Sequence, residues 1–193
     1  MNENIGQDTK ESNPDFKLVD AKDFPWLDLN YYDRIAAEFQ LKGFALIGDI
    51  EFVCFSEILP RGFHRTLSSR DGIIVAEIFH EKVRGFDLVL RLLFGRLFLS
   101  CKGIHLTTEF SDGNFVYTVT GKNRKNSDLL PAGIIKQVVA PTTSIRDMIE
   151  IHKSRIKEHI QQNPDNNALT LRTFQQWTES LNRVKSSSKQ IQT

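Results

Sequence analysis

The sequence predicts an α+β fold: an antiparallel sheet of about five to seven strands built from hairpins, packed by an N-terminal helix and two C-terminal helices. Its two hairpin signatures are Asp71-Gly72 and Asp112-Gly113, each set between runs rich in Val, Ile, Thr, Phe or Tyr. Glycine takes positive φ without strain and Asp tolerates it, so each pair predicts a two-residue hairpin turn. Helical apolar spacing near residue 30 and again after residue 144 supplies the helices.

The length of 193 residues fits one domain. Residues 1–22 and 186–193 are polar and lack periodicity, so we expect flexible tails on either side of a single α+β domain at 23–185. The chain has 25 Lys and Arg against 24 Asp and Glu, and this balance argues against a nucleic-acid partner.

Three helices are expected to pack on the sheet. The first spans 30–42 before Gly43, and the second begins after Ser144, which with Asp147 is spaced as a near capping box. The third is expected over 167–185. The first two helices should cover one face of the sheet, and the third should pack at an edge or against the second.

The strands are predicted from short apolar runs bounded by turn residues. A Gly48-Asp49 turn is expected to separate two of them, and a further helix is expected at 86–94. The predicted strand segments are 44–47, 51–58, a hairpin at 63–81, a strand from 97 onward, a hairpin at 104–121, and 134–139.

The turns also predict pairing. A turn at Asp71-Gly72 sets His64 opposite Phe79, and a turn at Asp112-Gly113 sets Phe110 opposite Phe115. In the second hairpin this pairing yields one apolar and one mostly polar face, as a half-buried sheet requires.

No motif for nucleophilic catalysis, phosphate binding or dinucleotide binding occurs, and no histidine pair has metal-ligand spacing. We therefore predict no catalytic residue, no metal and no cofactor, and lean against an enzyme. Cys54 and Cys101 lie in apolar surroundings and are expected to be buried and reduced.

Two groups of residues remain as candidates. The first is a basic, aromatic surface that could meet a protein or anionic lipid headgroups, formed by Arg84, Arg91, Phe94, Arg96, Phe98 and Lys102. The second is a His/carboxylate pocket formed by Glu77, His80, His105 and His152. His152 and His159 share an apolar stripe, which is more typical of neutral core histidines than of ligands.

Several short strings resemble a family of uncharacterised bacterial proteins with a single small domain of unknown function. They are Asp23-Phe-Pro-Trp-Leu27, Gly43-Phe44 with Gly48-Asp-Ile-Glu51, Thr107-Thr-Glu-Phe-Ser-Asp-Gly113 and Glu150-Ile-His-Lys153. Some members of that family carry an N-terminal hydrophobic segment, which this chain lacks. The resemblance implies a bacterial α+β domain and transfers no site residue.

The leading functional hypothesis is a non-enzymatic binding or adaptor module that engages a protein or membrane surface. One alternative is a small ligand-binding protein or enzyme that uses the His/carboxylate pocket. Another is a self-associating subunit, a homodimer through the third helix at Trp177 and Leu181. With no export leader at Met1 to Asp15, we expect a cytoplasmic protein, with peripheral association with the inner membrane as the variant for a lipid-binding module.

Overall fold

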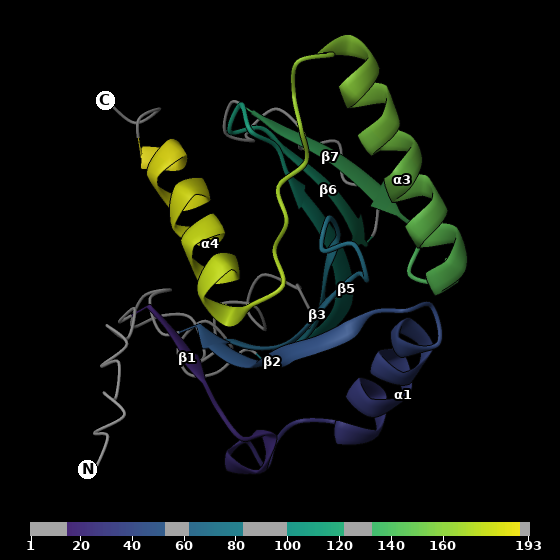
Figure 1. The fold of residues 1–193 in the computed structure, drawn as a ribbon. Helices are drawn as coiled ribbons and strands as arrows, with labels where there is room; N and C mark the ends of the chain where they lie inside the picture. The colour runs from purple at the N-terminus through teal and green to yellow at the C-terminus, as the bar shows by residue number, and fades with distance from the viewer. Residues whose placement is uncertain (1–14, 53–61, 83–99, 122–132, 190–193) are drawn as a thin grey trace, which may run out of the picture.

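The computed structural model describes residues 15–52, 62–82, 100–121 and 133–189 (Figure 1). Seven strands form one sheet whose spatial order is the order of the chain. All neighbours are antiparallel except β6 and β7, which run parallel. The strands are β1 Phe16–Leu18, β2 Ala45–Phe52, β3 Gly62–Ser68, β4 Val75–Lys82, β5 Ser100–Glu109, β6 Phe115–Thr120 and β7 Ile134–Val139.

The helices in the described part of the chain lie on both sides of this sheet. They are the short 3-10 helix η1 Ala21–Asp23, α1 Leu29–Gln40, α3 Ile145–Gln162 and α4 Phe174–Lys189. The predicted α+β class is confirmed. None of the helices in these ranges is both long enough and apolar enough to cross a membrane.

Helices α1 and α3 begin and end where their capping residues predict. The Asp28 carboxylate accepts the Tyr31 N–H at 3.2 Å, and the Ser144 hydroxyl accepts the Asp147 N–H at 3.1 Å. At the end of α1, Gly43 takes φ +86°, the left-handed conformation that closes a helix. The first two predicted helices are therefore confirmed to within two residues.

The main core lies between α1, α3 and one face of the sheet. The strands contribute alternate residues such as Phe63, Leu67, Ile78 and Leu106, all fully buried. A second, smaller cluster lies on the other face, where Trp177 of α4 packs with strand side chains and the chain before α4. Its buried members are Phe16, Ile50, Phe52, Val75, Leu171 and Trp177.

The third predicted helix differs from expectation in its start and in its place. It begins at Phe174 rather than 167, because residues before it run extended: Leu169 N–H donates to Glu109 O and Leu171 N–H to Gly72 O, both at 2.8 Å. Figure 1 shows α4 on the concave side of the curved sheet, away from α1 and α3. Packing at an edge or against the second helix was thus a wrong prediction. Helix α4 also continues to Lys189, past the start of the predicted C-terminal tail at 186.

The structure also differs from two predictions for the N-terminal part of the chain. Residues 16–18, placed in the tail, form β1, because Phe16 packs edge-to-face on Phe52 with ring centroids 5.1 Å apart. The Gly48-Asp49 turn is instead part of the continuous strand β2, with an irregularity between Leu46 and Gly48. A Cβ at Gly48 would lie 2.6 Å from a Leu18 methyl carbon, so glycine here allows β1 to approach β2.

The two hairpins differ in loop length. In the first, Ser69 N–H donates to Ile74 O across a four-residue loop in place of the predicted two-residue turn, and because both lengths are even, His64 still lies opposite Phe79 as predicted. In the second, Phe110 N–H donates to Asn114 O across a three-residue loop, and Phe115 lies opposite Glu109 rather than Phe110. The predicted pairing of the second hairpin is therefore wrong by one residue, because an odd loop replaces the expected even one.

The remaining strand and helix predictions fall partly outside the described ranges. The strand at 134–139 is confirmed as β7. The predicted helix at 86–94, the start of the strand from 97 and the end of the strand at 51–58 lie outside the described residues, as does Cys54.

Candidate metal centre

Three titratable side chains meet on the face of the sheet that carries α4. His64 comes from β3, Glu77 from β4 and His105 from β5. Glu77 lies directly opposite His105, and His64 lies opposite Phe79, one step further along the same face. Cross-strand neighbours and their diagonals are within reach of long side chains, so the pairing of three adjacent strands builds this cluster.

Hydrogen bonds join the three groups. His64 Nδ1 lies 3.3 Å from Glu77 Oε1, and His105 Nε2 is in close contact with Glu77 Oε2. An ionised carboxylate only accepts, so both ring nitrogens donate. The Glu77 side chain is 2% exposed, against 12% for His64 and 21% for His105, so the carboxylate forms the floor of the cluster.

The environment keeps Glu77 ionised. Burial favours the neutral acid, but the charge and hydrogen bond of His105, aided by His64, outweigh it and hold the pKa of Glu77 below its ordinary value. A carboxylate in this state needs no proton removed before it binds a cation.

Aromatic rings surround the two imidazoles. His64 stacks on Phe79 with centroids 5.7 Å apart, and the Phe79 ring is also 5.7 Å from His105. Phe79 lies this close to β5 because its partner is Gly103, where a Cβ would sit 2.4 Å from Phe79 Cζ. The glycine thus lets one aromatic ring hold both histidines in place.

Polar groups continue along the same face. The Tyr117 ring centroid is 6.3 Å from that of His105. Burial, together with the charges of Glu77 and Glu109, raises the pKa of Tyr117, so its hydroxyl stays protonated. Thr66, opposite Glu77, and Thr107, two residues beyond His105, each bury a hydroxyl that has no hydrogen-bond partner among the described residues.

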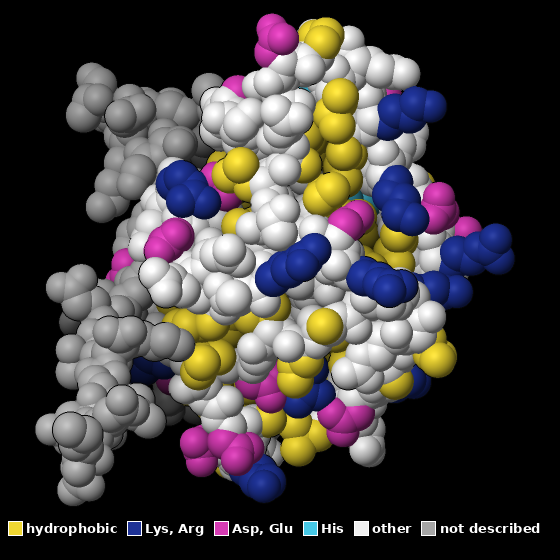
Figure 2. Space-filling view, in the orientation of Figure 1, with side chains coloured by type: hydrophobic (Ala, Val, Ile, Leu, Met, Phe, Trp, Pro, Cys, Tyr) yellow, Lys and Arg dark blue, Asp and Glu magenta, His cyan; other side chains and the backbone are white. Residues whose placement is uncertain are grey.

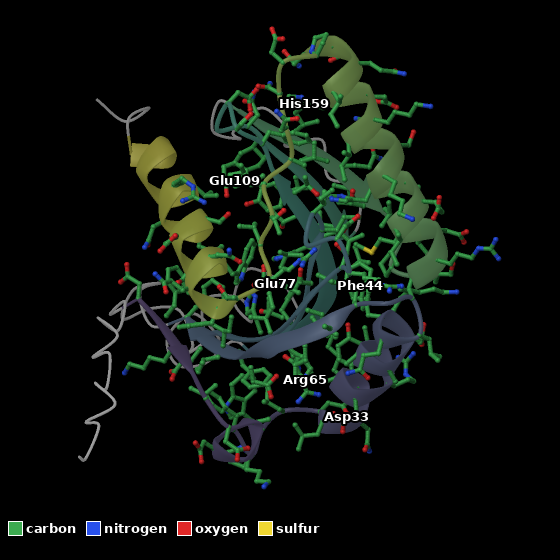
Figure 3. All side chains as sticks on the ribbon, in the orientation of Figure 1. Asp33, Phe44, Arg65, Glu77, Glu109 and His159 are labelled. Atoms are coloured by element: carbon green, nitrogen blue, oxygen red, sulfur yellow. The ribbon has the colours of Figure 1, made fainter. Side chains whose placement is uncertain are left out.

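Helix α4 is anchored to this face by a buried acid. Arg183 donates from Nε to Glu109 Oε1 at 2.5 Å and from Nη2 to Oε2 at 2.8 Å, a bidentate pair. Figure 3 shows Glu109 beside α4 and Glu77 deeper in the curve of the sheet.

The structure brings together two residues of the predicted His/carboxylate pocket, Glu77 and His105. His80 is three residues from Glu77 on the same strand and so points to the opposite face, where its ring lies 6.0 Å from that of Trp26. His152 also lies on that opposite side, buried between the hydroxyls of Thr108 at 3.0 Å and Thr118 at 2.9 Å.

His152 has the character expected of a core histidine. Burial lowers its pKa to about 3, so the ring is neutral. Its partners are two threonine side chains rather than backbone groups. His159 is likewise buried, with Nε2 3.6 Å from Asp112 Oδ2.

The predicted basic surface falls almost wholly outside the described residues, which include Lys102 but not Arg84, Arg91, Phe94, Arg96 or Phe98. Lys102 forms an ion pair with Asp28 and lies 5.1 Å from the centroid of the Tyr31 ring. The homodimer hypothesis placed Trp177 of the third helix in the contact between two copies. In the structure this side chain is fully buried within its own chain.

His64 is the member of the cluster that sequence reasoning did not select. The signal was present, because the predicted pairing of the first hairpin already set His64 and Glu77 on one face. The sequence did not predict the pairing of β4 with β5, which brings His105 to Glu77. These two strands lie on either side of residues 83–99, so no short hairpin turn indicates that they pair.

Comparison of the chain with protein-family models, with curated proteins and with solved structures finds no match in any of the three.

Proposed function

We propose that this protein binds a divalent metal ion of the zinc class through His64, Glu77 and His105, with a coordination position left for a small ligand. The observation that carries the proposal is that one ligand atom from each residue lies within 4.8 Å of the other two. Among the functions considered from the sequence, this is the ligand-binding alternative with a His/carboxylate pocket.

The donor set suits the ion. Two imidazoles and one carboxylate form the ligand set of one class of catalytic zinc site, in which water or substrate takes the fourth position. Bonds of about 2.0–2.1 Å in a tetrahedron place ligand atoms about 3.3 Å apart. The separation of His64 Nδ1 and Glu77 Oε1 is 3.3 Å and matches this spacing, whereas His105 Nε2 is closer to Glu77 Oε2 and has to move away from it to admit an ion.

Polar groups around the three proposed ligands also favour a bound metal ion with a water or small ligand. The unpartnered hydroxyls of Thr66 and Thr107 lie beside the ligands, and an orphaned buried hydroxyl is costly unless water or a ligand satisfies it. Tyr117 adds a protonated hydroxyl near His105. These groups can orient a ligand or water held by the metal.

Without a metal, the same three residues form a closed hydrogen-bond network, in which Glu77 accepts from both histidines. The metal-free and metal-bound states differ in the number of protons they hold. An ion that binds His64 Nδ1 and His105 Nε2 displaces the protons that those atoms donate to Glu77. Metal binding should therefore release protons and weaken as the pH falls.

Isothermal titration of the metal-free protein with Zn²⁺, checked by native mass spectrometry, tests the proposal. We expect one ion per chain and an affinity reduced by more than about tenfold in His64→Gln and in His105→Gln. His159→Gln is the matched control, a buried histidine on the opposite side of the sheet. Replacement with Co²⁺ adds a visible spectrum that reports tetrahedral coordination.

An unmetallated native mass in the presence of Zn²⁺ would overturn the proposal. So would binding that survives in both ligand variants while it falls in the His159 control. Either result would leave the cluster as a structural hydrogen-bond network around a buried carboxylate.

A further inference from the structure

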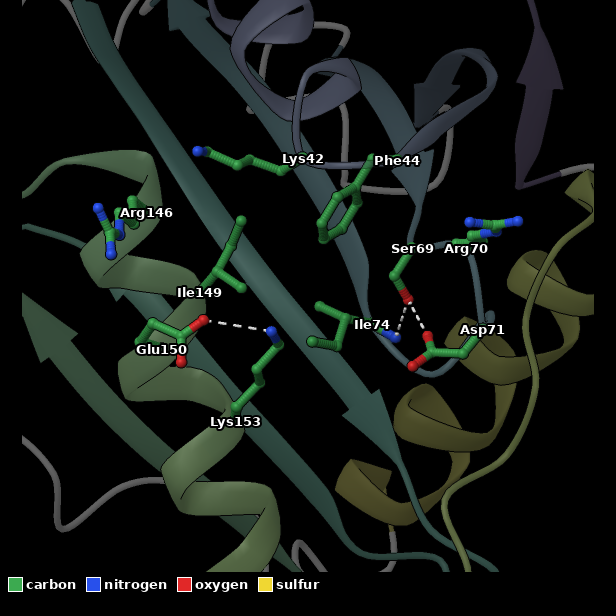
Figure 4. Close-up of a pocket in the computed structure, with 10 residues that line it drawn as sticks. All are labelled: Lys42, Phe44, Ser69, Arg70, Asp71, Ile74, Arg146, Ile149, Glu150 and Lys153. Atoms are coloured by element: carbon green, nitrogen blue, oxygen red, sulfur yellow. Dashed lines mark hydrogen bonds and ion pairs between the residues drawn. The ribbon is translucent and has the colours of Figure 1, made fainter.

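A separate cavity opens between the end of α1, the loop joining β3 to β4, and α3. Its volume is about 410 Å³, within the range of about 300–1,000 Å³ usual for small-molecule sites. Figure 4 shows Phe44, Ile74 and Ile149 gathered at its centre. The cavity thus has an apolar floor built from three different segments of the chain.

Charged side chains surround this floor, and most of them are cationic. The cavity is lined by four cations and two acids, although the whole chain has a net charge of only +1. Figure 2 shows dark blue Lys and Arg side chains around apolar ones where α1 approaches α3. The lining cations are Lys42, Arg70, Arg146 and Lys153.

Both acids are already engaged by neighbours. The Asp71 carboxylate accepts from the Ser69 hydroxyl at 2.6 Å (Figure 4), and it also accepts from the Ile73 N–H at 3.1 Å. Glu150 accepts from Lys153 at 3.2 Å. In the described part of the chain, no acid pairs with the other three cations, Lys42, Arg70 and Arg146.

We propose that this cavity binds an organic phosphate: a phosphate group joined to a short apolar body. Unpaired Lys and Arg side chains match the charge of a phosphate, and guanidinium groups also match its geometry. The floor of Phe44, Ile74 and Ile149 takes the apolar part, which inorganic phosphate lacks. The site is independent of the metal centre, which lies on the other face of the sheet.

Isothermal titration with octyl phosphate, kept below the concentration at which it aggregates, tests this site. We expect saturable one-to-one binding, with inorganic phosphate and octanol each at least about tenfold weaker, because each supplies only half of the interaction. Raising the salt concentration should weaken binding, since the cations are exposed.

The decisive variant is the double charge reversal Lys42→Glu with Arg146→Glu, which should weaken octyl phosphate binding by more than about tenfold. Its matched control is Lys136→Glu with Lys157→Glu, which reverses two exposed lysines that do not line the cavity. Both variants change the net charge equally, so a difference between them reports the cavity rather than the overall charge.

Sedimentation with phosphatidylglycerol vesicles separates two sources of the phosphate. Sedimentation that the cavity variant abolishes assigns it to a lipid headgroup, and binding of octyl phosphate without sedimentation assigns it to a soluble metabolite. Failure of octyl phosphate to saturate, or equal binding by wild type and cavity variant, would overturn the proposal. Neither result depends on whether Zn²⁺ binds.

Discussion

Arg183 holds both oxygens of Glu109 in a bidentate pair, and this contact ties the last helix to a strand 74 positions earlier in the chain. The carboxylate is buried, while the side chain of Arg183 is 47% exposed. The hydrogen bonds to Glu109 raise the pKa of the Arg183 guanidinium above its ordinary value, so the arginine stays charged at every accessible pH.

Replacing Arg183 with Ala should destabilise the protein by about 2 kcal/mol, because it leaves the buried Glu109 carboxylate without its main partner. The measurement is the urea dependence of unfolding. Arg34→Ala is the control, since it breaks an exposed pair with Glu38 and should cost well under about 1 kcal/mol. If Glu109→Gln restored no stability to the Arg183 variant, the explanation through the buried charge would fail.

The stability of the protein should fall in acid through Glu77. Its pKa is lower in the folded chain than in the unfolded one, so its contribution is present above about pH 4.5 and is lost as the pH falls further. Glu77→Gln should therefore flatten the acid limb of a plot of unfolding free energy against pH. Glu150→Gln, at an exposed position on α3, should leave that limb unchanged. Identical acid limbs in all three proteins would contradict this assignment.

His152 should produce a second pH dependence, at higher pH. Its pKa of about 3 in the folded chain lies below the ordinary 6.5, so the unfolded chain binds a proton first and stability falls as the pH drops below about 6.5. The loss between pH 8 and pH 5 should be about 2 kcal/mol, at about 1.4 kcal/mol per unit.

His152→Gln tests this assignment, because an amide can still bond Thr108 and Thr118 but cannot take a proton. Unfolding of the variant, followed at pH 8 and at pH 5, should show a smaller difference between the two than wild type does. A variant with the full wild-type difference would place the effect on another residue.

Gly103→Ala should disturb the proposed metal centre without replacing one of its ligands. The new methyl group would meet the Phe79 ring at 2.4 Å and displace it from its contacts with the two histidines. We expect a loss of about 1–3 kcal/mol in stability, as for overpacking in general, and weaker Zn²⁺ binding. Gly121→Ala is the control, because its methyl would have only an ordinary contact at 3.7 Å with Val138. Unchanged Zn²⁺ binding by the Gly103 variant would show that Phe79 does not position the histidines.

The sequence predicted the first two helices and the strand pairing of the first hairpin well because local rules decide them. Ser144 and Asp28 cap their helices through contacts within three residues, and Gly72 and Gly113 take positive φ in their turns. The parts that could not be predicted depend on distant segments. The start of α4 is set by pairing of Leu169 with Glu109, far away in the chain.

The candidate site divides in the same way. The pairing of a single hairpin was enough to predict that Glu77 and His64 share a face. His105 reaches them through the pairing of β4 with β5, which joins residues 28 positions apart in the chain. His80 and His152 were chosen by residue type: strand alternation along β4 sets His80 on the other face, and His152 lies on α3, which packs on that same side. Local pairing indicates which face a side chain takes, but only the order of the strands shows which faces share a site.

The lengths of the two hairpin loops limit how this chain can vary. Because side chains alternate along a strand, a one-residue insertion before β4 that shifted the pairing while the loop kept its four residues would turn Glu77 away from His64, whereas a five-residue loop or a bulge would keep the pairing. An insertion of two residues would keep both on the same face. The cluster therefore tolerates an odd change in the length of this segment only where the loop or a bulge, and not the pairing of β3 with β4, takes up the extra residue.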